Sequence, residues 1–251
     1  MNIGLVLSGG GARGAAHIGV IKALEEHNIF ITHIAGTSAG AIVGGLYAAG
    51  VSWSEILNFF KTITIFSTNR YARNKPGFLN SVNFYDDLKT FFPIDNFNAL
   101  KKPLFVTATN IIEGTLEIFS EGKLIEPILA SASFPGVFTP VKMNGTFYVD
   151  GGTLNNFPIE PLKPLCSKII GIYVNPLRKI EPKDLKHSYS VVDRAFEINT
   201  SSRSFNKFAS CDLLISPMEL NKYVPSTVLA LKISKIFNKN VNEIFFLENE
   251  D

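Results

Sequence analysis

The sequence predicts a three-layer α/β/α fold with a central, mostly parallel sheet. Short apolar runs alternate with longer helical patterns, which is the order expected when parallel strands are joined by helical crossovers. Glycine-rich turns follow the first two strand-like runs. The length of 251 residues fits one α/β domain, so we expect a single domain over residues 1–251.

Local patterns predict the individual elements. Short apolar runs predict strands over residues 3–7, 30–35, 103–109, 168–174 and 211–216. Apolar residues with helical spacing predict helices over residues 15–27, 39–49, 53–61, 83–91, 123–133, 188–208 and 226–238. Residues 141–149 contain an Asn-Gly pair, which is a strong signal for the two-residue turn of a β-hairpin.

A serine between two glycines follows the second strand-like run. The motif consists of Gly36, Thr37, Ser38, Ala39 and Gly40, and a helical pattern comes directly after it. This is the sequence form of a nucleophile elbow, in which a sharp strand-to-helix turn exposes the serine hydroxyl. The flanking glycines remove side chains that would collide at such a turn. The motif therefore predicts Ser38 as a nucleophile.

A glycine-rich loop follows the first strand-like run. It consists of Gly9, Gly10, Gly11, Ala12, Arg13 and Gly14. Such a loop exposes backbone N–H groups at a helix N-terminus, where negative charge is favoured. Its glycines match a dinucleotide fingerprint, but the acidic residue that this fingerprint needs after the second strand is missing. The loop therefore favours an oxyanion hole, formed by the amides of Gly10 and Gly11.

A third motif, Asp150-Gly151-Gly152, leaves the second strand of the predicted hairpin. Taken alone, an aspartate before two glycines indicates a turn. The context changes this interpretation, because the three motifs in this order resemble those of the patatin-like phospholipase family. Residues 131–140, with the sequence SASFPGVFTP, are similar to an internal S-x-S-x-P-x-x-F-x-P segment of that family. The resemblance runs over about residues 3–174.

The resemblance implies a role for each motif. Ser38 is the nucleophile, Asp150 is its only side-chain partner, and residues 9–14 form the oxyanion hole. The implied activity is that of a serine acyl-hydrolase acting on lipid esters, of the phospholipase A or lysophospholipase type. Arg13 has two alternative roles, as a positive charge near the oxyanion or as one half of a salt bridge that anchors the loop.

Three alternatives to this dyad hydrolase follow from the sequence. Of the four histidines, only His187 comes after Asp150, as a Ser-Asp-His triad would require, and we expect it in a solvated, charged stretch. The acyl-enzyme also suits a transacylase, although the related acyltransferases carry a histidine where this chain has Thr37. The third alternative is a catalytically silent lipid-binding module.

Composition narrows the partners and the location. The formal net charge is +2 with both signs interspersed, so we expect no nucleic-acid partner. No run reaches the roughly 18 apolar residues of a membrane span, and no signal peptide is recognisable, so we expect a cytoplasmic location. Metal-ligand spacings are missing, so we expect no cofactor and no metal. The sequence does not indicate an oligomeric state.

Two further features remain. Cys166 and Cys211 lack disulfide or CxxC spacing, so we expect buried free thiols. Residues 63–79 interleave aromatic residues with arginines and a lysine, a composition that suits a mobile lid in peripheral contact with a membrane and equally an ordinary connector.

Overall fold

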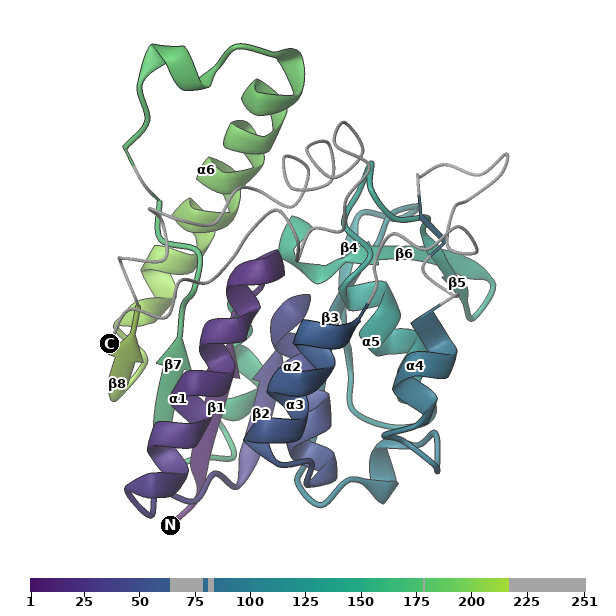
Figure 1. The fold of residues 1–251 in the computed structure, drawn as a ribbon, viewed down its shortest axis with the longest axis vertical. Coiled ribbons are helices and arrows are strands. Elements are labelled where there is room, and N and C mark those ends of the chain that lie inside the picture. The colour runs from purple at the N-terminus through teal and green to yellow at the C-terminus, as the bar shows by residue number, and fades with distance from the viewer. Residues whose placement is uncertain (64–78, 81–83, 178, 217–251) are drawn as a thin grey trace.

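The computed structural model describes residues 1–63, 79–80, 84–177 and 179–216 (Figure 1). Its centre is an eight-stranded mixed sheet in the order β5-β6-β3-β2-β1-β7-β8, with β4 paired to β3. The strands are β1 (Ile3–Leu7), β2 (His33–Gly36), β3 (Leu104–Asn110), β4 (Thr115–Phe119), β5 (Val141–Met143), β6 (Thr146–Asp150), β7 (Lys168–Ile172) and β8 (Leu213–Ile215). The helices are α1 (Ala15–Glu26), α2 (Ala39–Ala49), α3 (Trp53–Thr62), α4 (Tyr85–Lys89), α5 (Ile125–Ser131) and α6 (Ser188–Phe208).

The pairing confirms the predicted fold class, because the core of the sheet is parallel and helices flank it. Strands β3, β2, β1, β7 and β8 run parallel to one another, whereas β4, β5 and β6 form antiparallel pairs at one end. The predicted hairpin corresponds to β5 and β6. The antiparallel end contains Asp150, the last residue of β6.

The two faces of the sheet pack against different layers. Leu5 and Leu7 of β1 join one buried cluster with residues of α1, α2, α3 and α5, whereas Val6 joins a second cluster. This alternation follows from the two-residue period of a strand. The helices of the first layer lie in front of the sheet in Figure 1. The second cluster contains Phe157, Ile159 and Leu162, against which Phe208 at the end of α6 packs.

Some element boundaries differ from the predictions. The predicted strand at 30–35 corresponds to β2, which starts later; Phe30 lies before it and is exposed. Strand β4 has no counterpart among the predicted strands, because Glu117 interrupts its apolar pattern. Helix α4 is shorter than the predicted 83–91. The predicted helix at 226–238 lies outside the described residues, as does nearly all of the segment 63–79 for which a lid was considered.

Helix ends follow recognisable signals. Helix α3 begins with a capping box in which Ser52 and Glu55 satisfy each other's backbone amides. Helix α2 ends at Gly50, whose φ of 88° lies in the left-handed region that favours glycine. Within the described ranges, no helix is long and apolar enough to cross a membrane.

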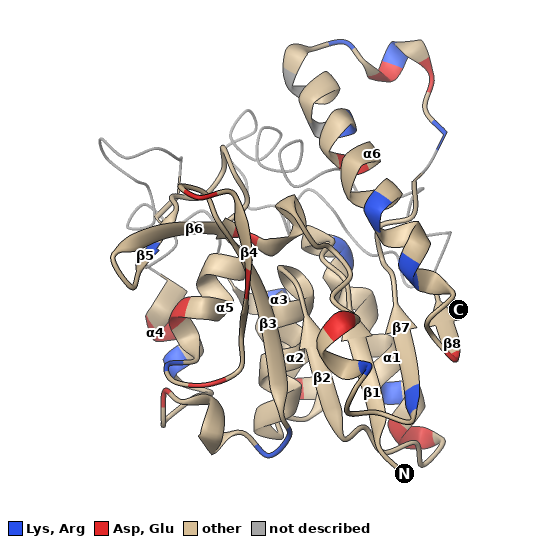
Figure 2. Ribbon diagram, turned by 180° about the vertical axis from the view of Figure 1, so that it is seen from behind, with Lys and Arg blue, Asp and Glu red and all other residues tan. Residues whose placement is uncertain are grey.

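The cysteines and the charges have simple placements. Cys166 and Cys211 are free thiols, but both are only half-buried, so the expectation of full burial is wrong. Each packs beside a glycine of the sheet, Gly4 and Gly171 respectively, near the exposed edge of the second cluster. Figure 2 shows acidic and basic residues interspersed over the described elements.

Candidate active site

Sheet register brings Ser38 and Asp150 together. Strand β2 pairs with β3 up to Val106, and β6 pairs with β3 from Ala108 onward. Strand β4 occupies the other side of β3 at both positions, so β2 and β6 lie on the same side and meet end to end. Strand β2 ends at Gly36 and β6 ends at Asp150. Ser38, two residues beyond the end of β2, therefore lies at the level of Asp150.

The backbone at Ser38 has the geometry of an elbow. Ser38 has φ 55° and ψ −123°, a conformation that costs a non-glycine residue about 1–3 kcal/mol. The flanking glycines are needed because a Cβ on Gly36 would collide with the Gly40 carbonyl, and one on Gly40 would collide with the Leu7 carbonyl. Ser38 itself is half-buried, so part of the residue is exposed to solvent.

Asp150 is a buried carboxyl with two hydrogen-bond donors. The Gly152 amide donates to its Oδ1 over 2.7 Å, and the Ser38 side chain lies close enough to lower its pKa by hydrogen bonding. Burial raises the pKa of Asp150 to about 7, although both hydrogen bonds act in the opposite direction. A Cβ on Gly151 would collide with the Thr107 carbonyl, which explains a glycine directly after the aspartate. A carboxyl with a pKa near neutrality, in contact with a serine hydroxyl, is suited to general base chemistry.

The glycine loop passes beside Ser38. A Cβ on Gly9 would lie 3.2 Å from the Ser38 Cβ, and one on Gly14 would lie 2.5 Å from the Ala39 Cβ. The Gly9 amide donates to the Asn156 carbonyl over 3.2 Å, so this amide is already occupied. The amides of Gly10 and Gly11 make no hydrogen bond within the described part of the chain, and both residues are half-exposed. They are the amides available to an oxyanion.

The other residues of the loop have structural positions. Gly11, Ala12, Arg13 and Gly14 form a single 3₁₀ turn, and the Arg13 amide donates to the Gly10 carbonyl over 3.1 Å. The Arg13 guanidinium is buried, donates to Asn175 Oδ1, and forms a salt bridge of 3.1 Å with Glu197 on α6. Of the two alternative roles of Arg13, the geometry supports the salt bridge that anchors the loop.

Several site residues were not predicted from the sequence. Asn156 is buried, and its side-chain amide donates a hydrogen bond of 3.4 Å to the Gly9 carbonyl. Thr107 was also not predicted; its Oγ1 lies 2.6 Å from Oγ1 of Thr37, an elbow residue that was predicted and that donates to the Asn155 carbonyl. The sequence signal for this part of the site was a pair of adjacent polar residues, Asn155 and Asn156, which the structure buries.

Segment 131–140 also contributes to the site. The Ser38 amide donates to Ser131 Oγ over 2.8 Å, and the Asp150 amide donates to the Ser133 carbonyl over 3.0 Å. The family-like S-x-S pattern indicated this segment but not its contacts.

The structure places His17 on α1 and His187 at the start of α6. His17 is fully buried, and its Nε2 lies 2.8 Å from the Ser8 carbonyl; burial lowers its pKa to about 4. His187 is exposed at the N-cap of α6. The hydrogen bonds that shift the pKa of Asp150 come from Ser38 and Gly152.

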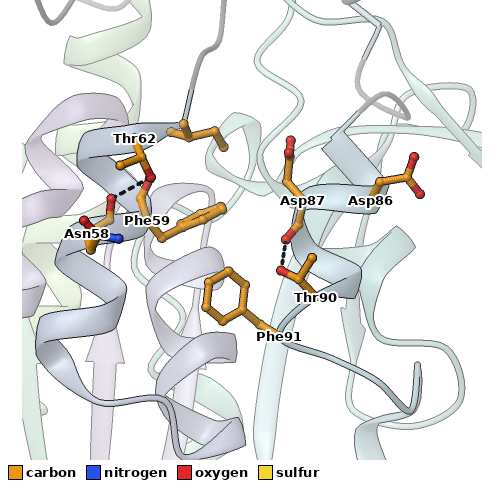
Figure 3. Close-up of a pocket in the computed structure, with 8 residues that line it drawn as sticks. Asn58, Phe59, Thr62, Asp86, Asp87, Thr90 and Phe91 are labelled. Atoms are coloured by element: carbon orange, nitrogen blue, oxygen red, sulfur yellow. Dashed lines mark hydrogen bonds between the residues drawn. The ribbon is translucent and has the colours of Figure 1, made fainter.

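A separate cavity of about 470 Å³ lies between α3 and α4 (Figure 3). Phe59 and Phe91 meet edge to face on one side, with 5.3 Å between their ring centroids. The lining residues are Asn58, Phe59, Thr62, Ile63, Asp86, Asp87, Thr90 and Phe91. Neither Ser38 nor Asp150 lines this cavity, so it is distinct from the candidate site.

Comparison with known proteins is consistent with this arrangement. The family model for patatin-like phospholipase matches residues 5–163. Lysophospholipase NTE1 of Meyerozyma guilliermondii is 34% identical over 174 residues, which are 67% of this chain and 12% of that protein. An uncharacterized NTE family protein of Mycobacterium bovis is 33% identical over 189 residues, which are 72% of this chain and 52% of that protein. The chain thus spans about half the length of the mycobacterial relative and a small part of the yeast one.

A solved structure shares the fold. VipD from Legionella pneumophila matches 74% of this chain and 52% of its own, with a TM-score of 0.51 and 16% sequence identity. At this identity the similarity concerns the fold alone.

Proposed function

Because this chain belongs to the patatin-like phospholipase family, we propose that it is a serine acyl-hydrolase that cleaves carboxylic esters of lipids. The observation that supports this most is the position of the Ser38 side chain beside the buried Asp150 carboxyl, where it lowers the pKa of Asp150 by hydrogen bonding. The relative named a lysophospholipase supports a phospholipid or lysophospholipid as the substrate class.

In the first half of the proposed reaction, Asp150 accepts the proton of the Ser38 hydroxyl while the serine oxygen attacks the ester carbonyl. The carbonyl oxygen becomes an oxyanion, to which the amides of Gly10 and Gly11 donate hydrogen bonds. The tetrahedral intermediate collapses when the protonated Asp150 returns its proton to the departing alkoxide. The acyl group is then bound to Ser38 as an ester.

In the second half, a water molecule replaces the alcohol. Asp150 takes a proton from this water as the oxygen attacks the acyl-enzyme, and the same two amides bind the second oxyanion. Proton return to Ser38 releases the fatty acid and restores the starting state. An alkoxide needs less help in leaving than an amine does, so a site with one carboxyl as its proton carrier suits esters rather than peptides.

A p-nitrophenyl ester series tests the substrate class. Each buried CH₂ contributes about 0.8 kcal/mol, so kcat/KM should rise from the acetyl ester to longer acyl chains. The matched control is Ser38→Ala, which should lose turnover of every ester. A clear preference for acetyl over all longer chains would contradict a lipid substrate. If long chains are preferred, fatty acid release from a panel of phospholipids and lysophospholipids would identify the headgroup.

A further inference from the structure

We propose that Ser131 is a positioning residue that holds the Ser38 elbow in its reactive conformation. The inference deepens the proposed hydrolase function and rests on it. Ser131 is the last residue of α5 and is fully buried. It touches the backbone of the nucleophile and not the atoms that react.

The first observation is the contact between Ser131 and the elbow. Ser131 Oγ accepts a hydrogen bond of 2.8 Å from the Ser38 amide. Ser38 is one of only three non-glycine residues with positive φ in the described part of the chain. A strained conformation of this kind persists only where its surroundings enforce it. Without the Ser131 hydroxyl, the Ser38 amide would be left without its acceptor, and the elbow would gain by relaxing.

The second observation is that the same segment also holds Asp150. The Asp150 amide donates to the Ser133 carbonyl over 3.0 Å, and Ser133 Oγ donates to the Leu129 carbonyl over 2.6 Å within its own helical turn. The C-terminal end of α5 is therefore bonded to the backbone of both Ser38 and Asp150. Their separation is set by one rigid element, although they belong to different strands of the sheet.

A consequence concerns the oxyanion hole. The amide of Ser38 points to Ser131 and is occupied, so it is not available to the substrate. The amides of Gly10 and Gly11 are among the donors near the nucleophile that make no hydrogen bond within the described part of the chain. Loss of the Ser131 hydroxyl should change where the Ser38 oxygen lies and leave the glycine loop in place.

The test compares Ser131→Ala with Ser204→Ala. Ser204 is equally buried, and its hydroxyl donates to the Thr200 carbonyl of its own helix, α6, over 2.8 Å. For each variant, kcat and KM on a p-nitrophenyl ester, the rate of Ser38 phosphonylation by a fluorophosphonate, and the melting temperature are measured. Ser131→Thr, which keeps a hydroxyl, is the rescue variant.

We expect Ser131→Ala to lower kcat and the phosphonylation rate by about 10- to 100-fold, because small misplacements of reacting atoms have effects of this size. KM and the midpoint of the pH profile should stay near their wild-type values, since the substrate contacts and the donors to Asp150 are unchanged. Ser131→Thr should recover most of the rate, and Ser204→Ala should keep it.

Two results would overturn the inference alone. One is that the wild-type enzyme is active and that Ser131→Ala has the same kcat and the same phosphonylation rate. The other is a loss of rate in both Ser131→Ala and Ser204→Ala that is proportional, in each variant, to the fall in melting temperature. Ser131 would then have a structural role alone. A wild-type protein with neither turnover nor phosphonylation would overturn the proposed function and this inference with it.

Discussion

The side chain of Ser38 lies beside the carboxyl of Asp150, close enough to lower its pKa by hydrogen bonding, at the point where β2 and β6 meet end to end along β3. In a Ser-His-Asp triad, an imidazole would stand between these two groups. In the proposed mechanism, this proximity makes Asp150 the immediate acceptor for the serine proton. Its burial and its neighbours then determine how the enzyme responds to substitution and to pH.

The first prediction separates a dyad from a triad. Asp150→Asn should lower kcat by about 10⁴-fold, the upper end of what loss of a general base costs, because no second group carries the proton. His187→Ala should stay within a few fold of wild type, since His187 is exposed at the start of α6. Circular dichroism of both variants should match the wild type.

Equal losses in the two variants would contradict the dyad. An esterase with a Ser-Asp-His triad through His187 would then replace the mechanism proposed above.

The second prediction concerns the pH dependence of kcat/KM. Burial raises the pKa of Asp150 to about 7, and only the ionised carboxyl accepts the serine proton. The rate should therefore rise with pH through a midpoint near this value. The same midpoint should appear in His187→Ala, which excludes the imidazole as its source. A rate already at its plateau near pH 5, as for an aspartate of ordinary pKa of about 4, would disagree with this burial effect.

The third prediction concerns stability. The folded-state pKa of Asp150 lies above its unfolded value of 3.8, so the folded protein keeps a proton that the unfolded chain releases. The resulting stabilisation is present below the unfolded pKa and is lost as pH rises through about 7. Asn does not titrate, so Asp150→Asn should gain stability relative to wild type between these limits, by an amount of the order of 4 kcal/mol at most.

Asp212→Asn provides the matched control. A hydrogen bond from Lys168 lowers the pKa of Asp212, so its stabilising effect is present at neutral pH and is lost as pH falls through the folded pKa. Denaturant titrations at acid and alkaline pH should give opposite trends for the two variants. A pH-independent difference between Asp150→Asn and wild type would refute the raised pKa.

The local geometry of the candidate site was largely predictable, because its motifs are local. Ser38 follows one strand and residues 9–14 follow another. The glycines in and around these segments indicate a sharp turn at Ser38 and exposed backbone amides in residues 9–14. Asp150 was predictable only in the company of the other motifs. Asn156 is brought to the site by the path of residues 151–165, and Ser131 by the position of the end of α5. These are tertiary contacts, which no local sequence pattern predicts.

The same distinction holds for the fold. Strand β1 was predictable because both of its faces are buried, so that its sequence is a continuous apolar run. Strand β4 contains Glu117 and is largely half-buried, so its pattern is weaker. The partner of Arg13 could not be predicted either, because Glu197 is brought to it only by the position of α6.

The fourth prediction concerns this anchor. Glu197 accepts hydrogen bonds from Arg13 and Arg194, and all three side chains are largely buried. Glu197→Gln should therefore lower the free energy of unfolding by several kcal/mol, since removal of one partner leaves a buried charge uncompensated. The control is Glu181→Gln, which breaks an exposed pair with Lys183 and should cost about 1 kcal/mol or less. Equal effects in chemical denaturation would show that the anchor contributes no more than a surface pair.

If Ser38 is the nucleophile of a serine hydrolase, an active-site-directed fluorophosphonate should form its adduct on this residue. Ser38 is the serine that combines an elbow, a contact with a buried carboxyl and two neighbouring unpaired amides. Peptide mapping by mass spectrometry should find one adduct, on Ser38, and labelling should fall sharply in Asp150→Asn. An adduct on a different residue, or no adduct on the folded protein, would contradict the account.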